Sequence, residues 1–277
     1  MTSLWLIPFL CLGLLFMTAP QTKNSRKKAA RSLLAQGKSW LAQGEMEKAL
    51  SAYDQAIQHD PVLAEAWYGR GVIRFLQADY EAALGDFDRA IRLKPKDAKA
   101  YLARGMLRFD RQELPLALLD LDQALALNPQ NPRAYNYRAA VKLRQQDWEG
   151  VVSDNTQALR LNPQYAEAWN DRGAARYRQE HFDQALADFT EALKWKPTFA
   201  QAYLNRGLVY LRLGRREEAE KDFAACLQHD PKLAERIATL KQQTGGQEQS
   251  GLPKRPAQEH FFDIVQVKTT LLHVITQ

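Results

Sequence analysis

Residues able to perform acid–base, nucleophilic or metal chemistry are few in this chain and lie far apart. Its 277 residues include five histidines and two cysteines. No histidine stands near a cysteine or a carboxylate pair at the spacing that a metal site or an activated nucleophile requires. The chain also lacks a phosphate-binding loop, a GxGxxG motif after a strand and a GxSxG motif. We therefore expect no enzymatic activity, no metal, no cofactor and no small-molecule substrate.

Charged side chains recur instead at one fixed interval along the chain. One arginine column and one aspartate column share five repeats: Arg70, Arg104, Arg138, Arg172, Arg206, and Asp86, Asp120, Asp154, Asp188, Asp222. One repeat earlier the same positions hold Gln36 and Ala52, so the columns begin together. This predicts structural pairing of each arginine with the aspartate of its own repeat, which contributes about 0.2–1 kcal/mol when exposed. A second basic column ends one repeat before the aspartate column does, so we expect it not to pair with the aspartates. Its members are Arg74, Arg108, Lys142 and Arg176.

The elements that must position these columns are short helices arranged in a repeat. Each repeat holds two segments of helical periodicity, each about a dozen residues long and too short to be stable alone in water. The segments must therefore pack in pairs, and the pairs must stack. A proline ends the second segment, because it lacks an amide donor and disfavours helix in the preceding residue. These prolines are equally spaced, without insertion or deletion: Pro61, Pro95, Pro129, Pro163, Pro197 and Pro231.

Aromatic and small residues keep the same register as the prolines. The first segment carries an aromatic column, Trp67, Tyr101, Tyr135, Trp169 and Tyr203, and four residues later a small column, Gly37, Gly71, Gly105, Ala139, Gly173 and Gly207. The second segment carries Tyr53, Phe87, Leu121, Asn155, Phe189 and Phe223. This pattern resembles the tetratricopeptide repeat, a helix-turn-helix unit of about 34 residues. The resemblance implies an all-α, right-handed α-solenoid of six such units over residues 30–244, with a capping helix from Ala234 to Gln243.

The fourth unit departs from the pattern in its small and aromatic columns. Ala139 replaces glycine and Asn155 replaces the aromatic residue. An asparagine at a core position must find a hydrogen-bond partner, or it costs about 1–3 kcal/mol. We therefore expect the weakest packing of the array in this unit.

Tetratricopeptide arrays line their concave side with the first helix of each unit, and the resemblance implies that an extended peptide binds in this groove. Units two and three then supply an apolar wall, and units four to six supply an arginine ladder with asparagines. Arginine can hold carboxylates with two hydrogen bonds, and asparagine can bond a peptide backbone. The predicted groove residues are Tyr68, Val72, Phe75, Leu102, Met106, Phe109, Asn136, Arg144, Asn170, Tyr177, Arg178 and Arg212. The alternative for the arginines is a role as solvated helix ends.

These positions predict a non-catalytic scaffold or adaptor whose partner is a protein segment with apolar anchors and acidic residues. Nucleic acid is not expected as a partner. The net charge is +6, but five basic residues lie between positions 23 and 31, which leaves 33 basic against 32 acidic residues elsewhere. A phosphate-tracking surface needs a basic stripe along the array.

An apolar segment, residues 1–22, precedes the basic flank at residues 23–31. The run from Leu4 to Ala19 would form a helix of about 24 Å, slightly short of a hydrocarbon core. Because the basic residues follow this run, the positive-inside rule predicts a membrane anchor with a cytoplasmic array. The alternative is a signal peptide and an exported protein that acts in envelope or complex assembly, although no basic residue precedes the run.

Two segments follow the array. Residues 245–258 are rich in glycine, glutamine and proline, and we expect a flexible linker. Residues 259–277 are rich in β-branched and aromatic residues. A short strand, a partner-docking tail and disorder remain open for this segment.

Overall fold

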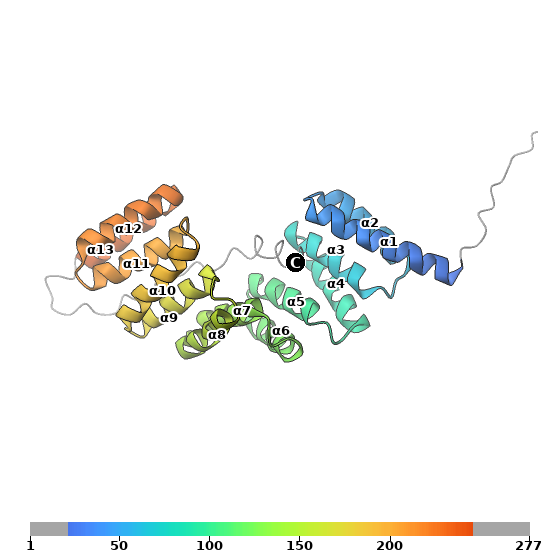
Figure 1. The fold of residues 1–277 in the computed structure, drawn as a ribbon, viewed down its shortest axis with the longest axis horizontal. Helices are drawn as coiled ribbons and strands as arrows, with labels where there is room; N and C mark the ends of the chain where they lie inside the picture. The colour runs from blue at the N-terminus through green and yellow to red at the C-terminus, as the bar shows by residue number, and fades with distance from the viewer. Residues whose placement is uncertain (1–21, 246–277) are drawn as a thin grey trace, which may run out of the picture.

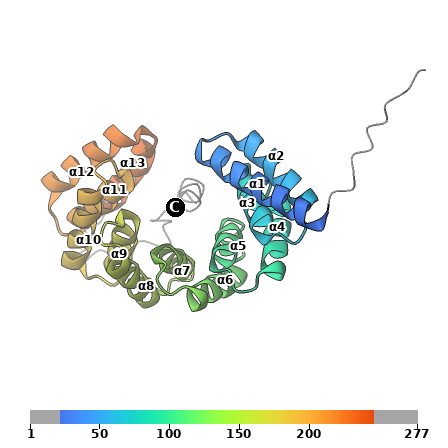
Figure 2. The ribbon, with the colours of Figure 1, turned by 45° about the vertical axis from the view of Figure 1, so that its right-hand side comes forward.

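A computed structural model of the chain describes residues 22–245, and side chains up to residue 242. Within this range the chain forms helices and no strand, and the predicted α-solenoid of helix pairs with a capping helix is confirmed. Figures 1 and 2 show the pairs stacked side by side into an open arc. The helices are α1 (Lys23–Ala42), α2 (Met46–His59), α3 (Ala64–Leu76), α4 (Tyr80–Leu93), α5 (Ala98–Asp110), α6 (Leu114–Leu127), α7 (Pro132–Arg144), α8 (Trp148–Leu161), α9 (Ala166–Arg178), α10 (Phe182–Trp195), α11 (Ala200–Arg212), α12 (Arg216–His229), the 3-10 helix η1 (Pro231–Leu233) and α13 (Ala234–Gly245).

The turns that join the helices follow the repeat closely. Each second helix ends two residues before the repeat proline, and Lys94, which precedes Pro95, is extended with φ −139° and ψ 78°. The turn inside each unit contains one residue with positive φ. Glycine fills this position only in the first and last units, so the sequence carried no consistent signal for it. The six residues are Gly44, Ala78, Gln112, Gln146, Glu180 and Gly214.

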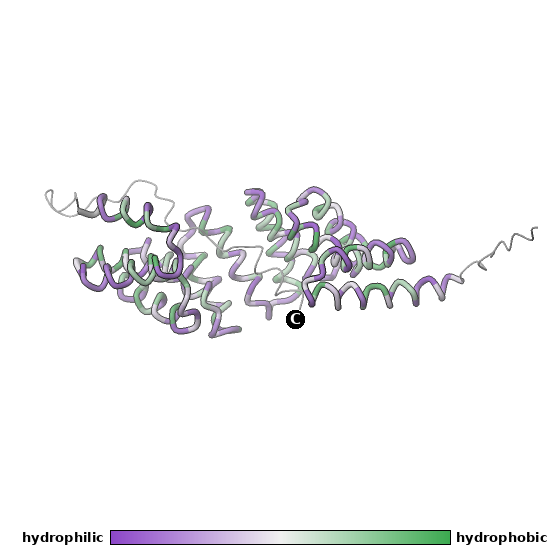
Figure 3. The backbone as a smooth tube through the Cα atoms, turned by 90° about the horizontal axis from the view of Figure 1, so that it is seen from above, coloured by the Kyte–Doolittle hydropathy of each residue, from purple (hydrophilic) through white to green (hydrophobic). Residues whose placement is uncertain are grey.

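Small residues in the first helix let the aromatic ring of the second helix approach the backbone. A Cβ atom on Gly173 would lie 2.9 Å from Cε1 of Phe189, and one on Gly207 would lie 2.7 Å from Cε1 of Phe223. Both rings are 1% exposed. Figure 3 shows hydrophobic and hydrophilic residues alternating along the helices, as helices with one buried face require.

Replacing Gly173 by alanine is therefore expected to destabilise the array. Overpacking of the Phe189 ring costs about 1–3 kcal/mol, which exceeds the gain in helix propensity of up to about 1 kcal/mol. The matched control is Gly85→Ala in α4, where no atom lies within 4 Å of the added Cβ and the propensity gain remains alone. Urea unfolding of the two variants should show shifts of opposite sign. A Gly173→Ala variant as stable as Gly85→Ala would contradict the packing argument.

The fourth unit buries both of its atypical residues. Ala139 of α7 and Asn155 of α8 are both 0% exposed. The Oδ1 atom of Asn155 accepts a hydrogen bond of 2.9 Å from Nδ2 of Asn136, the kind of partner expected for a buried amide. The Nδ2 atom of Asn155 is buried and has no hydrogen-bond partner among the described residues. A buried amide with only one of its two polar atoms hydrogen-bonded lowers the stability of the fourth unit.

The first and last helices are slightly longer than the sequence predicts. Helix α1 begins at Lys23, so the basic flank forms its first turns. Helix α13 covers the predicted capping helix and continues to Gly245. Among the described residues, no helix has the length and apolar character needed to cross a membrane. The predictions for residues 1–21 and for the segment from 246 to 277 lie outside the described residues.

Candidate functional site

The concave face of the arc is built by the first helix of each unit. Figure 2 shows α5, α7 and α9 on the inner side of the arc and α6, α8 and α10 on the outer side. The twelve residues predicted to line a groove all stand on α3, α5, α7, α9 and α11. They therefore belong to one layer, and they fall into an apolar part and a polar part.

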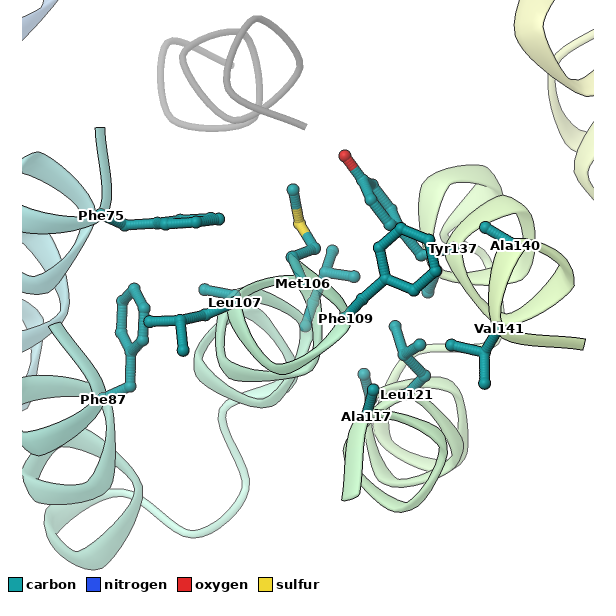
Figure 4. Packing of buried hydrophobic residues seen from close by; sticks show 14 of the residues in the cluster. Phe75, Phe87, Met106, Leu107, Phe109, Ala117, Leu121, Tyr137, Ala140 and Val141 are labelled. Carbon is teal, nitrogen blue, oxygen red and sulfur yellow. The ribbon is translucent and has the colours of Figure 1, made fainter. Parts of the chain in front are cut away.

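The apolar part is a set of five buried side chains, which we call the apolar wall: Val72, Phe75, Leu102, Met106 and Phe109. Their exposed fractions run from 0% to 6%. In Figure 4, the ring of Phe75 extends toward Met106, and Met106 and Tyr137 point toward the same side, whereas Leu121 of α6 lies away from that side. Tyr68 is half-buried beside this wall, and its ring centroid lies 6.1 Å from that of Phe87.

The hydroxyl of Tyr68 is buried and makes no hydrogen bond to the described part of the chain. Burial raises the pKa of this phenol well above its ordinary value. A buried hydroxyl without a partner is uncommon in a folded protein. It gives the otherwise apolar surroundings one group that can bond a polar atom of a ligand.

The arginine ladder consists of the last residues of three first helices, Arg144 of α7, Arg178 of α9 and Arg212 of α11. The guanidinium of Arg144 lies 6.0 Å from the ring centroid of Phe109, and that of Arg178 lies 5.6 Å from the ring of Trp148. Arg144 is exposed, and the other two are partly exposed, as is Tyr177. Cations at helix C-termini also interact favourably with the helix dipole. The ladder thus combines a local structural role with positive charge on the concave layer.

The predicted backbone-binding asparagines are engaged inside the array. Nδ2 of Asn136 donates to Oδ2 of Asp171 at 2.9 Å, and its Oδ1 accepts from the Tyr165 hydroxyl at 3.0 Å. Nδ2 of Asn170 donates to Oδ1 of Asp171 at 3.2 Å, and its Oδ1 accepts from Asn205 at 2.9 Å. Together with Asn155 these residues form one buried polar network across α7, α8, α9 and α11. A peptide backbone would have to replace these bonds, and the binding role of both asparagines stays a prediction.

Asp171 is the one carboxylate of this network. It is 5% exposed, and its hydrogen-bond donors within the described residues are amides rather than cations. Burial raises the pKa of the Asp171 carboxyl to about 6, although the hydrogen bonds from Asn136 and Asn170 oppose that rise. The sequence analysis did not single out this residue.

The Arg–Asp columns form one ion pair in each of five units. In unit five, Nη2 of Arg172 donates to Oδ1 of Asp188 at 2.8 Å and Nε donates to Oδ2 at 3.1 Å. The predicted pairing within each unit is confirmed in all five units. The prediction that the second basic column stays apart is wrong, because Arg176 also bonds Asp188 at 2.7 Å. Its counterparts Arg74, Arg108 and Lys142 do the same in their units.

The acidic, histidine and cysteine side chains of the described helices are not grouped for metal binding. Within residues 22–245, no group of three or more His, Cys, Asp or Glu side chains is placed to hold a metal ion. The charged pairs described above join the first and second helices of five units.

The fold and this surface define a class of repeat protein built from stacked helical hairpins. Family models described as tetratricopeptide repeat match residues 38–108 and 200–233, and one described as TPR repeat matches residues 105–146 and 175–214. The chain belongs to the tetratricopeptide repeat family. The unmatched interval, residues 147–174, includes the atypical Asn155. No curated protein matches the chain by sequence.

Solved structures with the same fold include three of low identity. Cut9–Hcn1 of the APC/C is 22% identical with a TM-score of 0.70, and the match covers 78% of this chain and 42% of that one. The pilF protein of Pseudomonas aeruginosa is 17% identical with a TM-score of 0.69, covering 77% and 99%. YrrB, a TPR protein with an unusual peptide-binding site, is 22% identical with a TM-score of 0.56, covering 68% and 98%. These likenesses concern the fold alone.

Proposed function

We propose that this protein is a non-catalytic interaction scaffold that binds an extended segment of a partner protein on its concave face. The observation that carries the proposal is the division of one helical layer into an apolar wall and an arginine ladder. Such a layer suits a segment with apolar anchors at one end and carboxylates at the other. The family supports an interaction role, and YrrB shows that this fold can carry a peptide-binding site.

A library of displayed peptides tests this proposal without knowledge of the natural partner. Selection on the purified chain should enrich peptides that place aspartate or glutamate on one side of an apolar or aromatic group. Recovery of no binding peptide would overturn the function, and recovery of basic peptides would overturn the assignment of the arginine ladder.

Replacing both Arg144 and Arg178 by alanine is expected to lower the affinity of the chain for a selected acidic peptide about 10- to 100-fold. The physical reason is the loss of two charge-assisted contacts at about 1.4 kcal/mol for each factor of ten. Loss of the helix-dipole interaction costs about 0.3–1 kcal/mol per arginine, so the array stays folded. Fluorescence anisotropy of the labelled peptide measures the affinity.

The matched control removes two cations from the ends of second helices. Arg160 and Lys194 are both exposed and lie in the last turns of α8 and α10, which are on the outer side of the arc. Replacing both by alanine changes the net charge by the same amount. Equal affinity of the two double variants would show that the ladder acts only through overall charge.

For the N-terminal segment we propose a membrane tether with a cytoplasmic array. Its support is the uncharged sequence of residues 1–22 followed by five basic residues. Membrane fractionation, external protease treatment and mass analysis of the N-terminus test this placement. A full-length, membrane-bound and protected chain supports the tether. A trimmed N-terminus or an array digested from outside the cell would favour the export alternative.

A further inference from the structure

The first two turns of helix α1 stand outside the packed array. This helix has 20 residues, whereas the first helix of each later unit has 13. The side chains from Lys23 to Lys28 are all exposed, and the first buried residue of the helix is Ala30. Figure 1 shows this end of α1 projecting beyond α2 and α3. Burial therefore contributes little to the stability of these turns.

The projecting turns concentrate positive charge on a helix that contains no aspartate or glutamate. Five cations lie between positions 23 and 31, all of them exposed, and none has an ion-pair partner among the described residues. They differ in this respect from Arg70 and its equivalents, which bond aspartates of the array. The five cations are Lys23, Arg26, Lys27, Lys28 and Arg31.

These charges also oppose the dipole of their own helix. The N-terminus of a helix carries a partial positive charge, which favours anions and disfavours cations in the first turns. Thr22 caps the helix by accepting a hydrogen bond of 3.2 Å from the amide of Ser25, and this neutral bond adds no negative charge. Four of the first six residues of the helix are cations, so they lower the stability of turns that burial does not support. An anionic partner would offset this cost.

The arrangement of the five cations favours an extended anionic surface over a groove or a strand of nucleic acid. At about 100° per residue they spread over about 200° of the helix circumference, which is more than one groove can contact. The rest of the chain holds 33 basic and 32 acidic residues, so a nucleic acid would find no basic track to follow. The 22 residues before Lys23 carry no charged side chain. Anionic lipid headgroups form a layer that adjoins such a sequence and can surround a helix.

We propose that the first two turns of α1 bind the phosphate-bearing headgroups of anionic membrane lipids. This inference rests on the membrane tether of the proposed function, which brings these turns to the bilayer surface. Each lysine or arginine near an anionic surface strengthens binding about fivefold. Helix α1 continues without interruption to Gly37 and Leu41, which are buried in unit one. Contact with the headgroups therefore also restricts the orientation of the array at the membrane.

Photo-cross-linking of the full chain in mixed vesicles tests this contact. A benzophenone amino acid takes the place of Asn24, an exposed residue among the cations. The vesicles contain phosphatidylcholine with about one phosphatidylserine in ten lipids. Mass analysis should find phosphatidylserine adducts at least as often as phosphatidylcholine adducts, which is an enrichment of about tenfold. Adducts in the ratio of the two lipids in the vesicle would overturn the inference.

Two full-length variants show whether these cations are responsible. Glutamine replaces lysine and arginine with little change in helix propensity, so both variants stay folded. The first variant carries Lys23→Gln, Arg26→Gln, Lys27→Gln and Lys28→Gln. The control removes four exposed cations of the array and carries Arg92→Gln, Lys96→Gln, Arg160→Gln and Lys232→Gln. The first variant should lose the phosphatidylserine enrichment, and the control should keep it. Equal loss in both variants would show that overall charge suffices, which would overturn the inference.

Vesicle binding distinguishes failure of this inference from failure of the tether. If the full chain binds both mixed and pure phosphatidylcholine vesicles without enrichment of phosphatidylserine, the tether stands and the inference fails. If the chain binds neither kind of vesicle, both fail.

Competing ligands test the other assignments of the same cations. A selected acidic peptide should bind the unchanged chain and the first variant with equal affinity, and weaker binding to the first variant would place these cations in the peptide site. A nucleic acid duplex that binds the unchanged chain more tightly than mixed vesicles do would assign the cations to nucleic acid. Either result would overturn the inference.

Discussion

Replacing Asp188 by alanine is expected to lower the free energy of unfolding by about 3–5 kcal/mol, because it leaves charged groups without their partner in a buried place. Asp188 is 1% exposed and accepts hydrogen bonds from both Arg172 and Arg176. Arg172 is itself only 9% exposed, so water cannot fully replace the lost carboxylate. Urea unfolding followed by circular dichroism measures the change.

The surface pair between Glu191 and Lys194 serves as the control for this prediction. Their side chains are 36% and 60% exposed and lie 3.1 Å apart. Glu191→Ala is expected to change the free energy of unfolding by no more than about 0.5 kcal/mol. If Asp188→Ala has an equally small effect, the Arg–Asp pairs do not stabilise the array.

The fold could be predicted almost completely because each unit repeats the same physical solution. Gly173 and Phe189 are complementary in size, and Pro197 follows the end of the helix that carries the ring. Repetition over six units separates such columns from chance. The positive φ of Gln146 could not be predicted in this way, because the position accepts several residue types at a modest conformational cost.

The pairing of the first arginine column with the aspartates could be predicted, but that of the second basic column was missed. The reason lies in unit six. Tyr210 replaces the second basic residue there while Asp222 persists, and from this loss we inferred that the two columns are independent. The inference assumes one partner for each carboxylate. A carboxylate has several acceptor sites, and Asp188 accepts bonds from two guanidinium groups. Loss of one donor therefore leaves the aspartate with a partner.

The buried polar network escaped the sequence analysis because its hydrogen-bonded partners lie in neighbouring columns of successive units. Asn136 bonds Asp171, and Asn170 bonds Asn205, and the separation within each pair exceeds the repeat length by one position. A comparison of equivalent positions cannot reveal contacts that advance beyond the repeat in this way. The type of an asparagine also does not tell whether its amide faces a ligand or a neighbouring helix. Only the structure shows that the amides of Asn136 and Asn170 face neighbouring helices.

Replacing Asp171 by asparagine is expected to remove a pH-dependent cost of about 3 kcal/mol, which is the free energy of a pKa raised by about two units. Burial raises the pKa of Asp171 from 3.8 to about 6 in the folded chain. Between these values the folded state holds a proton that the unfolded state has released. The free energy of unfolding therefore falls as the pH rises from about 4 to about 6, and then stays level for this group. Relative to the unchanged chain, Asp171→Asn should gain about 3 kcal/mol between about pH 4 and pH 7.

A second variant tests whether the buried network controls this titration. The hydrogen bond from Asn136 lowers the pKa of Asp171, so Asn136→Ala should raise it further and extend the fall in stability above about pH 6. Urea unfolding at several pH values between 4 and 8 measures all three chains. Because other carboxylates titrate in each chain, the informative quantity is the difference between variant and unchanged chain at each pH. A difference for Asp171→Asn that is constant with pH would mean that Asp171 titrates alike in both states, and the array would then carry no buried acid at this position.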